Sequence, residues 1–248
     1  MILTIDIGNS NTVLVGYEND DRVFTQRIET HKENVYTYYK EVFSAIDINV
    51  SEVVVSCVVP SVYEEFNKCV KEIYKIEPKY INGDTITNFK ILLDEPRDIG
   101  ADFIATGVGA LAKYPQPVII ADVGSATKLT VIDSEGSFAG GVIVPGLGTS
   151  VEALNSFIPH LPSVELVVPD RVIGNGTIPA IQSGVMFGLI AQIEGLASKM
   201  EAELGQKCIR VLTGGYAALF KDDITGFVYD PYLLSDGMYQ IVKKGMLV

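Results

Sequence analysis

The stretch DIGNSNTVLV at residues 6–15 recurs, with substitutions, as DVGSATKLTV at residues 122–131, and one offset of 116 residues aligns the two copies. In both copies an apolar run precedes Asp-x-Gly and another follows it, which predicts two strands joined by a tight turn. A single Asp-x-Gly is more often only a strand-ending turn, because both residue types are favoured there. Two copies in matching surroundings instead favour a duplicated domain.

The elements around the two copies repeat in the same order. The residue patterns predict strands over 2–7, 13–17, 23–28 and 52–57 with helices over 33–46 and 61–73, then strands over 118–121, 129–132, 138–144 and 209–212 with helices over 178–204 and 233–244. The repeat is domain-sized, far longer than the roughly 20–50 residues of a solenoid unit. We therefore expect an α/β protein of two duplicated domains, residues 1–115 and 116–248, each a mixed sheet flanked by helices.

Composition restricts the classes of function. The chain of 248 residues has a formal net charge of −12 and a pI near 4.6, which argues against nucleic-acid binding, since phosphate backbones are held by clustered Lys and Arg. No apolar stretch reaches the roughly 18 residues of a membrane span, and no secretion signal is evident at the N-terminus. Three widely spaced cysteines suit a reducing cytoplasm and argue against structural zinc.

The repeated turns suggest phosphate chemistry. Successive N–H groups of a tight Gly-containing turn form an anion-binding concavity, and a carboxylate at the strand end can hold a cation that neutralises phosphate. We expect Asp6 to be a Mg²⁺ ligand and Asp122 to be its partner on the other side of a cleft. A third strand end, Leu212-Thr213-Gly214-Gly215, offers bare backbone for a nucleoside, although such connections are common without any ligand.

Taken together, the motifs carry a family resemblance. They are DIGNSNT (6–12), GAD (100–102), DVGSAT (122–127), GGVIVPG (140–146), IGNGT (173–177), QSG (182–184) and TGG (213–215). This set resembles the actin, hexokinase and Hsp70 superfamily, whose domains are ribonuclease-H-like, and more closely the type III pantothenate kinases. The chain contains no Walker-type Gly-x-x-x-x-Gly-Lys-Ser/Thr motif to compete with this interpretation.

The resemblance implies ATP-dependent phosphorylation of pantothenate, the first step toward coenzyme A, by a homodimer that needs Mg²⁺ and a monovalent cation, K⁺ or NH₄⁺. It implies that Asp102 is the base that takes the hydroxyl proton, that Asp6 binds Mg²⁺ and that Asp122 belongs to the monovalent cation site. It assigns the acceptor to Gly100, Ala101, Asp102 and Thr177, and the nucleotide phosphates and nucleoside to Asp6, Gly8, Asn9, Ser10, Asn11, Thr12, Gly124, Ser125, Ala126, Thr127, Gly214 and Gly215.

Three positions depart from the family pattern. Phe103 stands where the family has an arginine for the substrate carboxylate, and Leu93 stands where it has a tyrosine. In the second turn, Lys128 and its neighbours replace a segment that ends in aspartate, and the Lys128 ammonium could sit where a soluble cation would otherwise bind. Three alternatives stay open: a pantothenate kinase that holds the carboxylate differently, a kinase for another hydroxylated small molecule, and a non-catalytic nucleotide-binding paralogue.

Overall fold

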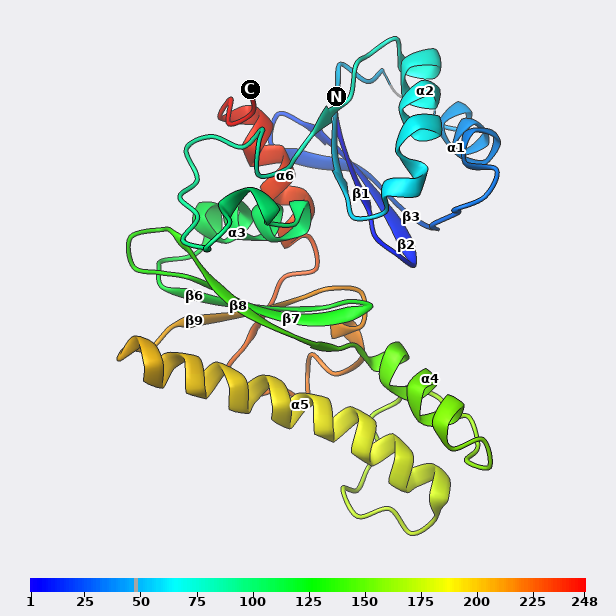
Figure 1. Cartoon of the computed structure of the whole chain (residues 1–248), viewed down its shortest axis with the longest axis vertical. Helices are drawn as coiled ribbons and strands as arrows, with labels where there is room; N and C mark the ends of the chain where they lie inside the picture. The colour runs from blue at the N-terminus through cyan, green and yellow to red at the C-terminus, as the bar shows by residue number, and fades with distance from the viewer. Residues whose placement is uncertain (47–48) are drawn as a thin grey trace. The chain divides into compact units, whose positions relative to one another are not determined.

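The computed structural model describes residues 1–46 and 49–248 and divides the chain into two compact units (Figure 1). Unit 1 comprises Met1–Lys113 and Leu233–Val248, and unit 2 comprises Tyr114–Tyr232. Asp230 ties the two ends of unit 2 together, because Tyr114 Oη donates to its Oδ2 at 3.0 Å and the Tyr232 N–H donates to its Oδ1 at 3.3 Å. Residues 233–248, which were expected in the second domain, belong to unit 1 instead.

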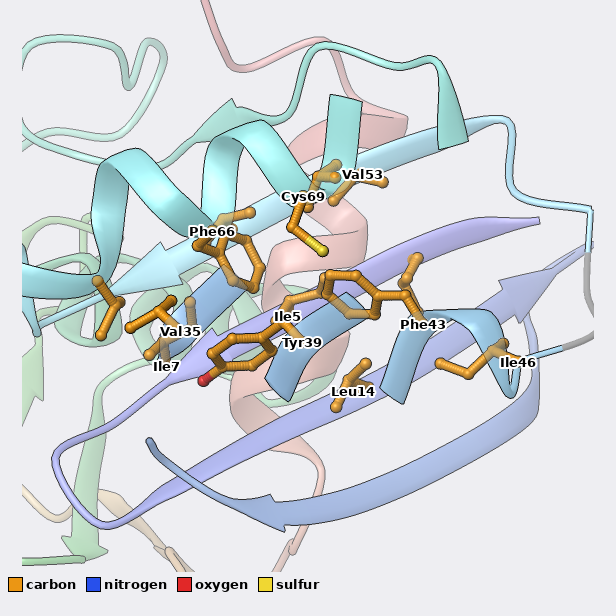
Figure 2. Close-up of a cluster of buried hydrophobic side chains, with 14 of the residues drawn as sticks. Ile5, Ile7, Leu14, Val35, Tyr39, Phe43, Ile46, Val53, Phe66 and Cys69 are labelled. Atoms are coloured by element: carbon orange, nitrogen blue, oxygen red, sulfur yellow. The ribbon is translucent and has the colours of Figure 1, made fainter. Parts of the chain in front are cut away.

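Unit 1 is built on a five-stranded mixed sheet in the order β3-β2-β1-β4-β5. The strands are β1 (Ile2–Ile7), β2 (Asn11–Glu18), β3 (Asp21–Glu29), β4 (Glu52–Cys57) and β5 (Lys79–Tyr80). On one face lie α1 (Val35–Ser44) and α2 (Tyr63–Tyr74), the latter entered through the 3₁₀ turn η1 (Pro60–Val62). Tyr39, Phe43 and Phe66 from these helices meet largely edge to face over the aliphatic residues of β1 and β4 (Figure 2).

Unit 2 repeats this plan with a sheet in the order β10-β9-β6-β7-β8. Its strands are β6 (Val118–Val123), β7 (Ala126–Ile132), β8 (Phe138–Pro145), β9 (Ile209–Thr213) and β10 (Val228–Tyr229), and its helices are α4 (Leu147–Phe157), α5 (Thr177–Leu204) and the 3₁₀ turn η3 (Ala217–Leu219). The predicted duplicated fold with two mixed sheets is confirmed. Helix α3 (Ala101–Lys113) of unit 1, helix α4 and the two-residue strands β5 and β10 were not predicted.

Helix α5 runs along the second sheet (Figure 1) and contributes Met186, Ile193 and Ala197, all fully buried, to the second core. By length and composition alone it is apolar enough to cross a membrane, contrary to the expectation that no segment is. About 33% of its most apolar window is buried, on the face that packs against the sheet.

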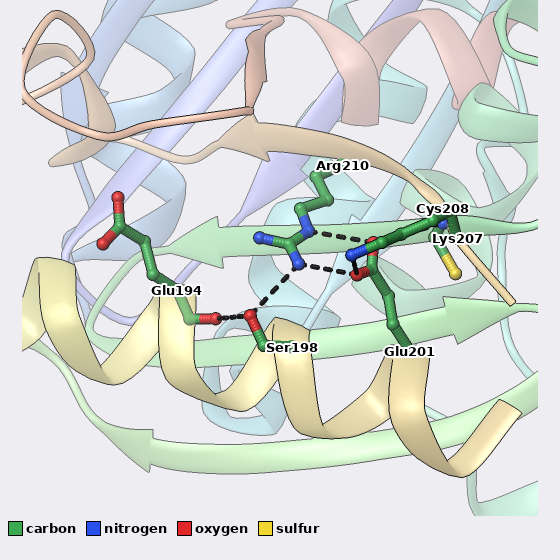
Figure 3. Close-up of polar contacts among 6 residues, drawn as sticks. All are labelled: Glu194, Ser198, Glu201, Lys207, Cys208 and Arg210. Carbon is green, nitrogen blue, oxygen red and sulfur yellow. Dashed lines mark hydrogen bonds and ion pairs between the residues drawn. The ribbon is translucent and has the colours of Figure 1, made fainter. Parts of the chain in front are cut away.

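The C-terminal end of α5 is fastened to the sheet by a buried carboxylate (Figure 3). Glu201, 6% exposed, accepts hydrogen bonds from Arg210 Nε at 3.1 Å and Nη2 at 2.8 Å. It also accepts from Lys207 Nζ at 2.8 Å and from the Cys208 N–H at 3.2 Å. These contacts join the last turns of α5 to the start of β9.

The two repeated hairpins match in register only after a one-residue correction. Ile7 pairs with Thr12 across the first turn, whereas Val123 pairs with Thr127 across the second, so the second turn is one residue shorter. Strands β1 and β6 are related by an offset of 116, but β2 and β7 by 115, and with that offset their burial patterns coincide residue by residue. The ungapped alignment from sequence is therefore wrong beyond the turn: Lys128 corresponds to Val13, not to Thr12.

The last helix belongs to unit 1 because it packs closely on α3 (Ala101–Lys113). In α6 (Leu233–Lys243), a Cβ at Gly237 would overlap the carbonyl oxygen of Ala105, and one at Gly109 in α3 would overlap that of Leu233. Asp236 of α6 also forms ion pairs with Arg22 at 3.2 Å and Lys113 at 2.5 Å. The sequence pattern could not indicate this placement, since it depends on glycines that let two helix backbones touch.

Candidate functional site

The first turn presents Asp6 at the end of β1. Asp6 lies beside Ser56 in the parallel register of β1 and β4, and Ser56 Oγ donates to Asp6 Oδ1 at 2.8 Å. The Gly8 N–H donates to the Asn11 carbonyl at 3.0 Å, which closes the turn, and Asn9 and Ser10 are exposed. The turn thus brings a carboxylate, backbone groups and two exposed polar side chains to one strand end.

Thr12 lies in the core beneath this turn. It is fully buried, and its Oγ1 is hydrogen-bonded to Thr30 Oγ1 at 2.9 Å and to Tyr39 Oη at 2.7 Å. Burial raises the pKa of Tyr39 above its usual range, so its hydroxyl stays protonated. The structure therefore uses the Thr12 hydroxyl to hold the turn on α1.

A basic side chain beside the first turn was missed from the sequence. Lys32 Nζ donates to Asn9 Oδ1 at 3.3 Å, and the Thr30 N–H donates to the Ser10 carbonyl at 3.0 Å. The segment after β3 therefore flanks the turn and supplies a positive charge near it. The sequence gives no signal for Lys32, because this residue belongs to no motif.

The second turn presents Asp122 in a different environment. Lys128, directly opposite Asp122 in the antiparallel register, places Nζ 2.8 Å from Asp122 Oδ2, and both side chains are 15% exposed. Gly214, at the end of β9, has a φ of +97°, and a Cβ there would lie 2.5 Å from Asp122 Oδ1 and overlap the backbone of Val123. Only glycine allows β9 to end against this carboxylate.

Helix α4 begins at the second turn. Thr149 Oγ1 donates to the Ser125 carbonyl at 2.9 Å, and the N-cap residue Gly146 packs so closely that a Cβ would overlap the Gly124 carbonyl oxygen. No side chain caps the helix, so its first backbone N–H groups and the positive end of its dipole lie beside the turn. Nearby, the buried Thr127 Oγ1 has no hydrogen-bond partner within the described residues, unlike its counterpart Thr12.

Asp102 lies in the first turn of α3, where the Phe103 N–H donates to its Oδ1 at 2.9 Å. A Cβ at Gly100 would lie 2.6 Å from the same oxygen and 3.2 Å from the Phe103 ring. Gly100 therefore leaves room for the Asp102 carboxylate, which explains why a glycine lies two residues before this aspartate. Leu93 is half-buried in the loop before this segment.

The predicted site residues fall in both units. Asp6, Gly8–Thr12 and Gly100–Asp102 lie in unit 1, and Asp122, Gly124–Thr127, Gly214, Gly215 and Thr177 lie in unit 2, with Thr177 exposed as the first residue of α5. Within unit 2 the structure joins the second turn to Gly214 and α4; within unit 1 it joins the first turn to Ser56 and Lys32. That the two turns bind one nucleotide between them stays a prediction.

The carboxylates suit Mg²⁺ at one turn only. Among residues 1–46 and 49–248, no three His, Cys, Asp or Glu side chains form a metal cluster. Mg²⁺ commonly binds through one or two carboxylates together with phosphate oxygens and water. Asp6 fits this description, whereas Asp122 is already paired with the Lys128 ammonium and does not fit a soluble monovalent cation.

Comparison with solved structures defines the fold. The activator of 2-hydroxyisocaproyl-CoA dehydratase from Clostridium difficile with bound ADPNP is similar with a TM-score of 0.56 at 13% identity, covering 98% of this chain and 95% of that one. MreB5 of Spiroplasma citri bound to ADP is similar with a TM-score of 0.54 at 14% identity, covering 99% and 97%. The chain has the actin-like ATPase fold.

The family follows from sequence comparison. The model of the type III pantothenate kinase family matches residues 2–199. A type III pantothenate kinase of Roseiflexus sp. (strain RS-1) is 37% identical over an alignment of 252 positions that covers 98% of each chain. This chain belongs to the type III pantothenate kinase family.

Proposed function

We propose that this chain transfers the γ-phosphoryl group of ATP to the primary hydroxyl of pantothenate and forms 4'-phosphopantothenate, the first step of coenzyme A biosynthesis. The observation that carries the proposal is family membership over nearly the whole chain, together with a duplicated fold that brings an aspartate and a turn to the same strand end in each unit. ATP use is consistent with the actin-like ATPase fold.

In this proposal the two turns and the start of α4 bind the triphosphate through backbone N–H groups, and Gly214 and Gly215 flank the nucleoside. Asp6, oriented by Ser56, would hold Mg²⁺. When bound, the ion would neutralise charge on the β- and γ-phosphates, the main requirement of phosphoryl transfer. Because the metal supplies positive charge, an acidic chain can bind an anionic nucleotide.

Asp102 is proposed as the base. The hydroxyl oxygen of the acceptor bonds to the γ-phosphorus, the bond from that phosphorus to the β–γ bridging oxygen breaks, and ADP leaves while the hydroxyl proton passes to the Asp102 carboxylate. Gly100 and the Phe103 N–H support this role by fixing the position of Oδ1.

The test follows 4'-phosphopantothenate formation with Mg²⁺ and ATP in wild type, Asp102→Asn and the control Asp98→Asn. The exposed Asp98 lies four residues before Asp102, outside α3. We expect product from wild type and the control, and a loss of about 10²–10³-fold in kcat in Asp102→Asn. Equal rates in Asp102→Asn and wild type would contradict the assignment of the base.

The unusual Phe103 allows the acceptor itself to be tested. The family arginine would form a bidentate pair with a carboxylate, which a phenyl ring cannot do. If only Phe103→Arg phosphorylates pantothenate, the native acceptor is another hydroxylated small molecule. Nucleotide binding without transfer to any acceptor would identify a non-catalytic paralogue.

We also propose a homodimer formed through α5. Its outer face bears Gly184, Gly188, Ala191 and Gly195. Apart from the adjoining backbone of α5 itself, no atom of the described residues lies within 4 Å of a Cβ built on any of the three glycines. The adjoining α4 and loop leave Phe157 and Ile173 exposed at 89% and 83%. Small residues at helical spacing let a second helix approach closely, and exposed apolar side chains gain from burial.

Sedimentation equilibrium measures the assembly. Wild type is expected to sediment as a dimer, and Gly188→Arg as a monomer, because the long side chain would occupy the contact. Thr25→Arg, on the exposed side of β3, should leave the dimer intact. A wild-type monomer at micromolar concentration would contradict this proposal.

The cytoplasm is the proposed compartment. Cys57, Cys69 and Cys208 are free thiols, as expected in a reducing environment. Burial raises the pKa of the Cys69 thiol to about 11, which keeps it unreactive. Cell fractionation with immunodetection tests this assignment, and recovery from the membrane or secreted fraction would contradict it.

A further inference from the structure

The cross-strand partner of each strand-end aspartate differs between the two turns. Asp122 pairs in register with Lys128, and Asp6 pairs in register with Val13. Since the burial patterns of β2 and β7 coincide, these are equivalent positions on equivalent strands. The position opposite the strand-end aspartate is therefore apolar in the first repeat, Val13, and cationic in the second, Lys128.

The ammonium lies in direct contact with the carboxylate. Nζ lies 2.8 Å from Asp122 Oδ2, and both side chains are largely removed from water. Two partly buried charges at this distance interact more strongly than an exposed pair, because solvent screens them less. The pair as a whole is neutral, so the second aspartate does not repel a phosphate.

The other oxygen of Asp122 is also enclosed. Oδ1 lies where a Cβ on Gly214 would be only 2.5 Å away, so the backbone at the end of β9 covers it. A soluble cation at this carboxylate would have to share the space with the Lys128 ammonium, against like-charge repulsion. The side-chain pair and a soluble ion therefore exclude one another.

We propose that Lys128 is a built-in monovalent cation, whose fixed ammonium takes the place of a soluble K⁺ or NH₄⁺ at the second turn and makes nucleotide binding independent of such ions. This inference rests on the proposed use of ATP, but not on pantothenate being the acceptor. Lys128 acts on the nucleotide by neutralising Asp122, and is a positioning residue rather than a catalytic one.

The test measures binding of a fluorescent ATP analogue with Mg²⁺, in KCl, NH₄Cl or tetramethylammonium chloride at constant ionic strength. In wild type we expect the Kd to differ by less than about twofold among the three salts, because no ion couples to the nucleotide. In Lys128→Ala, which leaves Asp122 unpaired beside the phosphates, we expect the Kd to rise roughly tenfold in tetramethylammonium and to recover in K⁺ or NH₄⁺.

Lys128→Met retains much of the side-chain length without the charge, and is used if the alanine variant does not fold. It should weaken binding in all three salts, because its side chain still fills the space. Lys244→Ala, at an exposed position after α6, is the matched control and should behave as wild type.

Two results overturn the inference: wild-type binding that needs K⁺ or NH₄⁺ by tenfold or more, or a Lys128→Ala Kd that is the same as wild type in every salt. The binding assay contains no pantothenate, so a failure of the proposed acceptor leaves its outcome unaffected. Failure of wild type to bind the nucleotide in any salt would overturn the proposed function and this inference together.

Discussion

The two strand-end turns have the same backbone arrangement, but their aspartates have different partners. Each follows the central strand of a five-stranded sheet, and each is closed by a hydrogen bond from the Gly8 or Gly124 N–H at 3.0 Å. The first leaves Asp6 beside a hydroxyl, and the second neutralises Asp122 with a lysine and covers it with Gly214. Duplication therefore fixed the buried positions, whereas the position opposite the aspartate was free to change.

The largest expected effect comes from exchanging the carboxylates for amides one at a time. Asp6→Asn removes the proposed Mg²⁺ ligand and should lower kcat about 10³-fold, since charge neutralisation dominates phosphoryl transfer. Asp122→Asn removes a carboxylate that is already paired, and should cost about tenfold or less. Steady-state kinetics with Mg²⁺ titration measures both, and equal losses in the two variants would remove the proposed difference between the turns.

A second prediction concerns the strand end next to each aspartate. In unit 2, Asp122 pairs with Thr213, and Gly214 is the next residue. In unit 1, Asp6 pairs with Ser56, and the next residue is Cys57, so Gly214 and Cys57 are equivalent. Gly214→Ala forces a Cβ into the Val123 backbone at a positive φ and should cost about 3 kcal/mol of unfolding free energy. The half-buried Cys57→Ala should cost about 1 kcal/mol.

Urea unfolding of both variants compares these costs. If Gly214→Ala is tolerated as well as Cys57→Ala, the close approach of β9 to Asp122 is not required. Gly226→Ala, at another positive φ but with open space around its Cβ, separates backbone strain from the clash.

The smallest predicted effect concerns the contacts that hold the helices on the sheet, which differ between the two units. Unit 1 uses aromatic packing, whereas the end of α5 in unit 2 is held by Glu201. Hydrogen bonds from Arg210, Lys207 and the Cys208 N–H lower the pKa of Glu201 to about 2. The folded state therefore binds this proton less readily than the unfolded chain, so the stabilisation is present above the ordinary glutamate pKa and lost as pH falls toward 2.

Glu201→Gln should reduce the unfolding free energy at pH 7 by about 2 kcal/mol, or about 4–8 °C in Tm for a chain of this size. The variant should also show a flatter loss of stability between pH 5 and pH 2, and the exposed Glu203→Gln should match wild type. Thermal unfolding across this pH range provides the measurement. An unchanged pH profile in Glu201→Gln would mean that the ion cluster contributes nothing to stability.

The sequence predicted what depends on local patterns. Strand alternation and the two Asp-x-Gly turns identified the hairpins, and the repeat indicated two similar sheets. The sequence could not reveal α4, because Gly148, Thr149 and Ser150 are weak helix formers and the helix is held by Gly146 and Thr149 at the turn. It also missed the one-residue register change, because ungapped letters match equally well on both sides of the turn.

Site prediction was limited in the same way. A motif gives residue types but not which side chains point into the core, so Thr12 was expected at the phosphates although its hydroxyl bonds Tyr39. Lys32 reaches Asn9 through the fold and has no sequence signature. In contrast, the suggestion that Lys128 could replace a soluble cation came from comparing the sequence with the family pattern, and the ion pair with Asp122 supports it.

The interruption of unit 1 by unit 2 has a consequence for biosynthesis. A nascent chain presents β1 to α3 before unit 2, but α6, which packs on α3, leaves the ribosome only after unit 2. Until then the α3 surface around Gly109 lacks its partner. Because Asp230 joins Tyr114 to Tyr232, folding of the inserted unit brings the two halves of the interrupted unit together and shortens the loop that must close. Completion of unit 1 therefore depends on the folding of unit 2.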